Sequence, residues 1–172
     1  MLGLKTLSAA AKSRQIQLHI NIAEYACESD LPIADKQLLF RAREAAEEAY
    51  APYSNFRVGA AILLANGDIV TGSNQENAAF SMCMCAERTA LAAASYLYPN
   101  VAPVAMAITA RAYNSVLQVP VPPCGACRQV IAETESRFRK SVRILMQGEI
   151  GVIWKVDSVK EILPLTFNAS FL

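Results

Sequence analysis

Apolar and polar residues alternate near the start of the chain. Every second residue from 16 to 22 carries a large aliphatic side chain: Ile16, Leu18, Ile20 and Ile22. A period of two is typical of a half-buried strand, because successive side chains of a strand point to opposite faces of a sheet. The pattern therefore predicts a strand over residues 16–22, followed by a polar connection over residues 24–32.

Residues 35–50 carry apolar side chains at helical spacing instead. These positions are Leu38, Leu39, Ala42, Ala45, Ala46 and Ala49, with charged residues between them. The spacing predicts a helix from Asp35 to about Tyr50. After a loop over residues 51–55, two apolar runs over residues 58–64 and 69–72 predict strands. Asn66-Gly67 lies between them and supplies the residues of a tight hairpin turn.

The second half of the chain continues with both kinds of element. Residues 87–97 are rich in alanine and end before Pro99, which predicts a buried helix that begins near Cys85. Residues 104–110 are apolar throughout, as expected of a strand covered on both faces. A helix, two strands and a short helical turn are predicted next, over residues 125–137, 142–146, 151–155 and 159–163. This order implies a mixed sheet with helices packed on its faces.

Composition places this chain among globular domains. It has 172 residues, of which 53% are apolar and 18% charged, and this excludes a disordered protein while weakly favouring an oligomer. The net charge is +1, without a cluster of basic residues, so we expect small-molecule partners and no nucleic acid. No stretch reaches the ~18 apolar residues of a membrane span. We therefore expect no membrane association and a cytoplasmic location.

Four of the five cysteines form two close pairs, Cys83 with Cys85 and Cys124 with Cys127. An odd number in tight pairs favours a reduced compartment and metal binding over disulfides. Cys85 lies at the start of one predicted helix, and the second pair lies at the start of the next. The positive end of a helix stabilises thiolates, so we expect a zinc ion there. The single histidine, His19, is expected to pack or to face solvent.

Three charged residues lie close to these cysteines. Arg88 follows Cys85 by three residues and Arg128 follows Cys124 by four, although a cation in the first helical turn opposes the helix dipole. Three thiolates around one zinc ion leave a negative charge, so both arginines could donate to sulfur; solvated arginines are the alternative. Glu87 could be a general acid and base, or an acid that complements the dipole. Cys-x-Glu before Pro-Cys-x-x-Cys is the pattern of zinc deaminases.

Five motifs resemble those of the small cytidine deaminases, in the same order and with similar spacing, over about residues 36–168. They are YAPYSNFRVGAA at residues 50–61, NQEN at 74–77, CAERTA at 85–90, PCGACRQ at 123–129 and LPLTF at 163–167. Cysteine rather than histidine at position 85 is similar to the homotetrameric branch of that family. Phe80 departs from the pattern, because the family usually has a tyrosine there.

The resemblance implies an α/β fold with three layers, α-β-α, and a mixed five-stranded sheet. Residues 36–172 would form the catalytic domain, and residues 1–35 would be an N-terminal extension that adds one strand. The implied reaction is zinc-dependent hydrolytic deamination of cytidine and 2'-deoxycytidine to uridine and 2'-deoxyuridine, with release of ammonia, in pyrimidine salvage. The implied assembly is a homotetramer with shared active sites.

The resemblance also implies a role for each site residue. Cys85, Cys124 and Cys127 would hold one zinc ion per chain with a water in the fourth position, and Glu87 would carry protons from that water to the base and to the leaving amino group. Phe56 would stack on the base, and Asn74 with Glu76 would bind the ribose 3'-hydroxyl. The nucleoside would also meet the backbone around Ala86 and, from a neighbouring subunit, Phe167.

Two other functions are compatible with parts of this pattern. The same machinery could deaminate a modified or antibiotic cytosine nucleoside, as the related blasticidin deaminases do. Alternatively, Cys83 and Cys85 could join Cys124 and Cys127 in a closed, structural four-cysteine zinc module. A structural module would leave Glu87 and the two arginines without a role.

Overall fold

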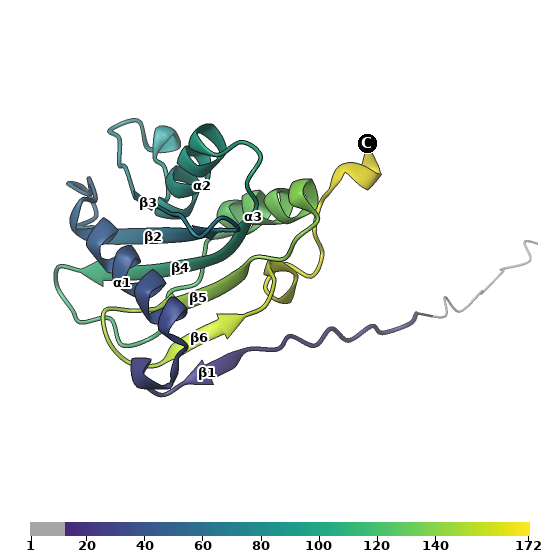
Figure 1. The fold of residues 1–172 in the computed structure, drawn as a ribbon, viewed down its shortest axis with the longest axis horizontal. Helices are drawn as coiled ribbons and strands as arrows, with labels where there is room; N and C mark the ends of the chain where they lie inside the picture. Colours follow the sequence, from purple (N-terminus) through teal and green to yellow (C-terminus); the bar gives the residue numbers. More distant parts are fainter. Residues whose placement is uncertain (1–12) are drawn as a thin grey trace, which may run out of the picture.

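The computed structural model describes residues 13–172, and a sheet runs through its centre (Figure 1). Its strands are β1 (Ala23–Tyr25), β2 (Phe56–Leu64), β3 (Ile69–Ser73), β4 (Pro103–Ala112), β5 (Arg143–Gln147) and β6 (Ile153–Val156). Their order across the sheet is β1-β6-β5-β4-β2-β3. Strands β4 and β5 are parallel, whereas the other neighbouring pairs are antiparallel. The predicted mixed sheet is confirmed, with the additional N-terminal strand at its edge.

Helices cover both faces of this sheet. They are α1 (Ile33–Glu47), α2 (Ala86–Leu97) and α3 (Gly125–Phe138). One buried cluster joins α1 to the sheet through side chains that include Leu39 and Ala107. A second cluster joins α2 and α3 to the opposite face and includes Ile108 and Ile131. Adjacent residues of β4 thus contact different helices, which confirms the three-layer α-β-α architecture.

Short 3-10 turns complete the described chain. They are η1 (Glu28–Asp30), η2 (Phe80–Met82), η3 (Val159–Glu161) and η4 (Ala169–Phe171). Turn η3 lies where the sequence predicts a helical turn. Within residues 13–172, no helix has both the length and the apolar content needed to cross a bilayer.

Two glycines allow helices to approach the sheet closely. A Cβ atom added to Gly59 of β2 would lie 2.0 Å from the carbonyl oxygen of Ala42 in α1. A Cβ atom added to Gly72 of β3 would lie 2.4 Å from the backbone nitrogen of Ala90 in α2. Both distances are far below van der Waals contact, so a larger residue would push the helix away. Gly72 therefore helps to set the position of α2.

The prediction of a strand over residues 16–22 is wrong. The strand of this region is β1, which pairs with β6 from Ala23 opposite Lys155 to Tyr25 opposite Ile153. Because β6 ends at Val156, residues before position 22 run past the end of their neighbouring strand and lack a ladder partner. Residues 13–22 instead form a segment outside the sheet, which runs away from β1 (Figure 1) and is joined to the domain by a hydrogen bond from the Asn21 backbone N–H to Glu161 Oε2 at 2.8 Å. Its aliphatic side chains are exposed, with Ile16 at 72%, and His19 also faces solvent.

Candidate active site

Three cysteine sulfurs meet where helices α2 and α3 begin. Cys85 is the residue before α2, Cys124 is the residue before α3, and Cys127 lies in the first turn of α3. All three sulfurs lie within 4.8 Å of one another, and Cys124 Sγ is 3.8 Å from Cys85 Sγ and 3.5 Å from Cys127 Sγ. Three thiolates bound to one tetrahedral zinc ion at about 2.3 Å lie about 3.8 Å apart. This donor set therefore fits zinc.

Cys83 lies outside this cluster. Its Sγ accepts a hydrogen bond from the Asn77 backbone N–H at 3.3 Å and donates to the Asn77 carbonyl oxygen at 3.6 Å. In the described part of the chain, the group of potential metal ligands contains the other three sulfurs and not this one. The geometry therefore does not favour a closed four-cysteine module.

The cysteine cluster carries negative charge before any metal is considered. A hydrogen bond from the Cys127 thiol, with help from the Arg88 guanidinium, lowers the pKa of Cys85 to about 5. The same hydrogen bond raises the pKa of Cys127, because its proton is shared with a neighbouring thiolate. A bound zinc ion would deprotonate each thiol that coordinates it.

Arg88 is the cation that faces this cluster. Its Nη2 atom donates to the Cys83 carbonyl oxygen at 3.0 Å and to Cys85 Sγ at 3.9 Å. The hydrogen bond to Cys85 also raises the pKa of Arg88. Its Nε atom is buried and has no hydrogen-bond partner among the described residues. A buried, unpaired guanidinium N–H is best accommodated beside anionic sulfur, as the sequence led us to expect.

Arg128 is placed differently from Arg88. Its Nε atom donates to the Pro123 carbonyl oxygen at 2.8 Å, and its Nη1 atom donates to the Ile162 carbonyl oxygen at 2.9 Å. Within residues 13–172, no hydrogen bond joins Arg128 to a cysteine sulfur, in contrast to the sequence-based expectation. The side chain instead ties the start of α3 to the C-terminal segment.

Glu87 lies in the first turn of α2, two residues after Cys85. The residue is buried, with 4% of its surface exposed. Burial raises the pKa of its carboxyl group, and the nearby Cys85 thiolate adds to this effect. A raised pKa makes the carboxylate a stronger proton acceptor, which suits a general base that later acts as an acid.

The nucleoside-contact residues expected from the sequence gather around the loop between α1 and β2. The Asn74 side chain accepts a hydrogen bond from Val58 N at 2.8 Å and donates to the Phe56 carbonyl oxygen at 2.9 Å. Backbone hydrogen bonds join Gln75 to Met84 in both directions, at 2.9 Å each. This segment is therefore attached both to the strand of Phe56 and to the residue before the cysteine cluster.

Glu76 binds the same loop through its carboxylate. One oxygen, Oε2, accepts the backbone N–H groups of Tyr53 at 2.8 Å and Ser54 at 3.2 Å, while Oε1 accepts the Ser54 hydroxyl. The hydrogen bond from the Ser54 side chain, followed by the two N–H groups, lowers the pKa of Glu76. Ser54 was not among the predicted site residues, although a serine in a Tyr-Ser-Asn-Phe turn is a common source of local side-chain hydrogen bonds.

The remaining predicted site residues differ in their exposure. Ala86 is fully buried at the start of α2. Phe167 is 59% exposed, and its carbonyl oxygen accepts a hydrogen bond from Gln129 Nε2 of α3 at 2.7 Å. Phe80 is 71% exposed and contacts Tyr53 edge to face, with ring centroids 5.9 Å apart. Aromatic surface is thus left uncovered next to Glu76 and in the C-terminal segment.

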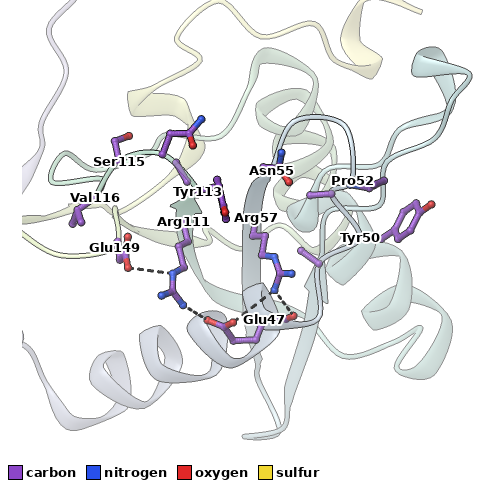
Figure 2. Close-up of a pocket in the computed structure, with 14 residues that line it drawn as sticks. Glu47, Tyr50, Pro52, Asn55, Arg57, Arg111, Tyr113, Ser115, Val116 and Glu149 are labelled. Atoms are coloured by element: carbon purple, nitrogen blue, oxygen red, sulfur yellow. Dashed lines mark hydrogen bonds and ion pairs between the residues drawn. The ribbon is translucent and has the colours of Figure 1, made fainter.

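A large cavity of about 860 Å³ lies elsewhere, beyond the end of α1 (Figure 2). The backbone carbonyl oxygen of Glu47 accepts a hydrogen bond from Arg57 at 3.1 Å, and its carboxylate accepts one from Arg111 at 2.9 Å. Arg111 also pairs with Glu149 at 3.2 Å. The described residues that line the cavity include no cysteine and leave neither arginine unpaired, so we do not assign the reaction to it.

Comparison with known sequences supports the zinc-site interpretation. Residues 32–143 match the family described as "Cytidine and deoxycytidylate deaminase zinc-binding region". The chain is 44% identical over 136 residues to a cytidine deaminase of Halalkalibacterium halodurans, which covers 78% of this chain and 96% of that protein. It is 47% identical over 133 residues to a cytidine deaminase of Sporosarcina psychrophila, covering 77% of this chain and 90% of that protein.

Solved structures give the same result. The fold superposes on a cytidine deaminase from Burkholderia pseudomallei with a TM-score of 0.65 and 36% identity, covering 76% of this chain and 97% of that chain. For a cytidine deaminase from Mycobacterium tuberculosis the TM-score is 0.61 and the identity 29%, covering 80% of this chain and 99% of that chain. The family match includes all three clustered cysteines and Glu87.

Proposed function

This chain belongs to the cytidine and deoxycytidylate deaminase family, and from this membership we propose that Cys85, Cys124 and Cys127 hold one zinc ion per chain beside Glu87. The chain is a zinc-dependent hydrolytic deaminase that converts cytidine to uridine and ammonia. The observation that carries the site assignment is the meeting of three sulfurs within 4.8 Å beside a buried carboxyl group.

Glu87 transfers both protons of the reaction in this proposal. When bound, zinc supplies a Lewis acid that lowers the pKa of the attacking water. Glu87 takes a proton from this water and delivers it to N3 of the base while the new C–O bond forms at C4. It then moves the remaining hydroxyl proton to the 4-amino group, the C–N bond breaks and ammonia leaves. Burial of Glu87 favours its protonated form between these steps.

The nucleoside is held by the residues around the α1–β2 loop. Phe56 stacks on the base, Asn74 and Glu76 bind the sugar 3'-hydroxyl, and the backbone at Ala86 contacts the pyrimidine edge. Because these contacts use the 3'-hydroxyl rather than the 2'-hydroxyl, 2'-deoxycytidine is expected to be a second substrate. The relatives named as cytidine deaminases do not favour an antibiotic nucleoside as the main substrate.

The enzyme is further proposed to act as a homotetramer with shared active sites. Tyr53 and Phe80 are 51% and 71% exposed beside Glu76, and Phe167 is 59% exposed at the C-terminal segment. Large aromatic side chains exposed together are typical of protein interfaces. A second copy that covers them would bury the rings and exclude water from the nucleoside site.

The substitution Glu87→Gln tests the proton-transfer role. We expect it to leave zinc content and folding unchanged and to lower kcat for cytidine by about 10²- to 10⁴-fold, the usual contribution of a positioned general acid and base. The measurement is the rate of cytidine deamination by purified protein, with zinc determined in the same sample. Glu133→Gln, which changes an exposed carboxylate of α3, is the matched control. A Glu87→Gln enzyme as fast as the parent would show that another group transfers the protons.

A further inference from the structure

One serine hydroxyl connects the two parts of the proposed nucleoside site. We infer that Ser54 is a positioning residue that orients Glu76 toward the sugar, and that it thereby determines how strongly the enzyme prefers nucleosides with a 3'-hydroxyl. This inference rests on the proposed contact between Glu76 and the sugar, and it adds a residue whose own side chain does not touch the substrate.

The hydrogen bonds around Ser54 place its hydroxyl between two functional residues. The Ser54 hydroxyl donates to Oε1 of Glu76. Its own oxygen, Ser54 Oγ, accepts a hydrogen bond from the backbone N–H of Phe56 at 3.0 Å. The base-stacking residue and the sugar-binding residue are therefore joined through one side chain. A change in the position of this hydroxyl would affect the carboxylate directly and the Phe56 backbone at the same time.

The hydroxyl also fixes a rotation that the backbone leaves free. The N–H groups of Tyr53 and Ser54 both bind Oε2, so by themselves they hold one oxygen of the Glu76 carboxylate. The second oxygen, Oε1, is held by the Ser54 hydroxyl and keeps one further acceptor position, because each carboxylate oxygen has two lone pairs. A carboxylate held at both oxygens presents this free acceptor in one direction.

Burial does little to hold this loop in place. Tyr53, Ser54 and Asn55 are all exposed, and Asn55 has a φ of 53°, a conformation that most residues adopt only when other contacts enforce it. Polar contacts, of which Glu76 makes three, therefore carry much of the local order. An acceptor that is already oriented loses less conformational entropy when the sugar hydroxyl binds.

The test compares 2'-deoxycytidine with 2',3'-dideoxycytidine, two substrates that differ only at the 3'-hydroxyl. With the zinc-loaded enzyme, we expect Ser54→Ala to raise KM for 2'-deoxycytidine by about 3- to 10-fold relative to KM for the dideoxynucleoside, the usual loss for one hydrogen bond, while kcat is largely kept. Any effect through the Phe56 backbone is common to both substrates, whereas the dideoxynucleoside has no 3'-hydroxyl for Glu76 to bind. The preference for 2'-deoxycytidine over the dideoxynucleoside should therefore fall by the same factor.

Matched variants separate positioning from general damage. Ser54→Thr keeps a hydroxyl at this exposed position, so it should restore the preference. Ser136→Ala removes an exposed serine of α3 whose hydroxyl makes no hydrogen bond within the described chain, and should have no effect. In a Glu76→Ala background, Ser54→Ala should cause no further loss of preference.

Each contrary result has a distinct meaning. Equal loss for both substrates, or no change for either, would overturn the inference, because Ser54 would then act only on loop stability or not at all. A parent enzyme that does not distinguish 2'-deoxycytidine from 2',3'-dideoxycytidine would instead contradict the proposed contact between Glu76 and the sugar, and the inference about Ser54 would then be wrong as well. Zinc content and thermal unfolding of each variant show whether the protein is folded.

Discussion

Residues two positions apart can have different chemistry in this protein. Cys85 precedes helix α2, faces two other sulfurs and has its pKa lowered to about 5. Cys83 lies two residues earlier in the chain and exchanges hydrogen bonds with the Asn77 backbone. The open zinc site that a deaminase needs depends on this difference, because a fourth sulfur would occupy the position of the attacking water.

Serine substitutions at these two cysteines test the site. We expect Cys83→Ser to retain one zinc ion per chain and most of the activity, because serine can keep the contact with Asn77. Cys85→Ser should lose both, because a serine hydroxyl is a poor replacement for a thiolate ligand. Zinc stoichiometry after dialysis and the rate of cytidine deamination are measured on both variants. Equal zinc loss in both would support the structural four-cysteine module instead.

Helices act in this protein by bringing their N-termini together. The proposed zinc ligands lie where α2 and α3 begin, and both helices pack on the same face of the sheet. The position of α2 depends on its close approach to β3 at Gly72. Since Cys85 and Glu87 move with α2, a contact in the core controls the geometry of the site.

A methyl group at Gly72 should disturb the site from a distance. In Gly72→Ala the new Cβ atom would meet the backbone of α2 at 2.4 Å, and overpacking of this kind usually costs about 1–3 kcal/mol of unfolding free energy. We expect a lower melting temperature together with slower cytidine turnover. The control is Gly125→Ala, whose Cβ atom would have no neighbour within 4 Å and should not destabilise the fold. A parental melting temperature for Gly72→Ala would contradict this view of helix placement.

At the scale of the whole molecule, the N-terminal extension has two different parts. Residues 13–22 are exposed and lie outside the sheet, whereas β1 pairs with β6 and Leu31 is buried in the core cluster that includes α1. Glu28 also forms an ion pair with Arg43 of α1. All proposed site residues thus lie after the proposed domain boundary near residue 35, but the hydrophobic core includes residues on both sides of that boundary.

Two truncations should separate these parts. Removal of residues 1–22 should leave the melting temperature unchanged. Removal of residues 1–34 should lower it, because burial of Leu31 alone contributes about 1.5–3 kcal/mol, and the β1 pairing is lost as well. Both proteins should bind zinc and deaminate cytidine at low temperature, since the ligands and Glu87 all lie later in the chain. Inactivity of a folded, zinc-loaded truncated protein would show that the extension reaches the site.

The sequence by itself determined most of the elements, and it predicted the three cysteines that lie together in the structure. Helical and strand periods report which side of each element is buried, so α1, α2, α3 and the five strands of the domain were predicted within a few residues. The spacing of Cys85, Glu87, Cys124 and Cys127 is local to two helix starts. Chemistry that depends on local spacing can therefore be predicted from the sequence before the fold is known.

Tertiary structure decided the features that depend on a distant partner. The alternation at residues 16–22 has the period of a strand, but a ladder needs a neighbour, and β6 ends too early to provide one. Arg88 and Arg128 have similar spacing from a cysteine, yet the second arginine meets the Pro123 and Ile162 carbonyl groups instead of sulfur. A period records which side of an element is buried, whereas a hydrogen bond requires a particular atom, which only the folded chain brings within reach.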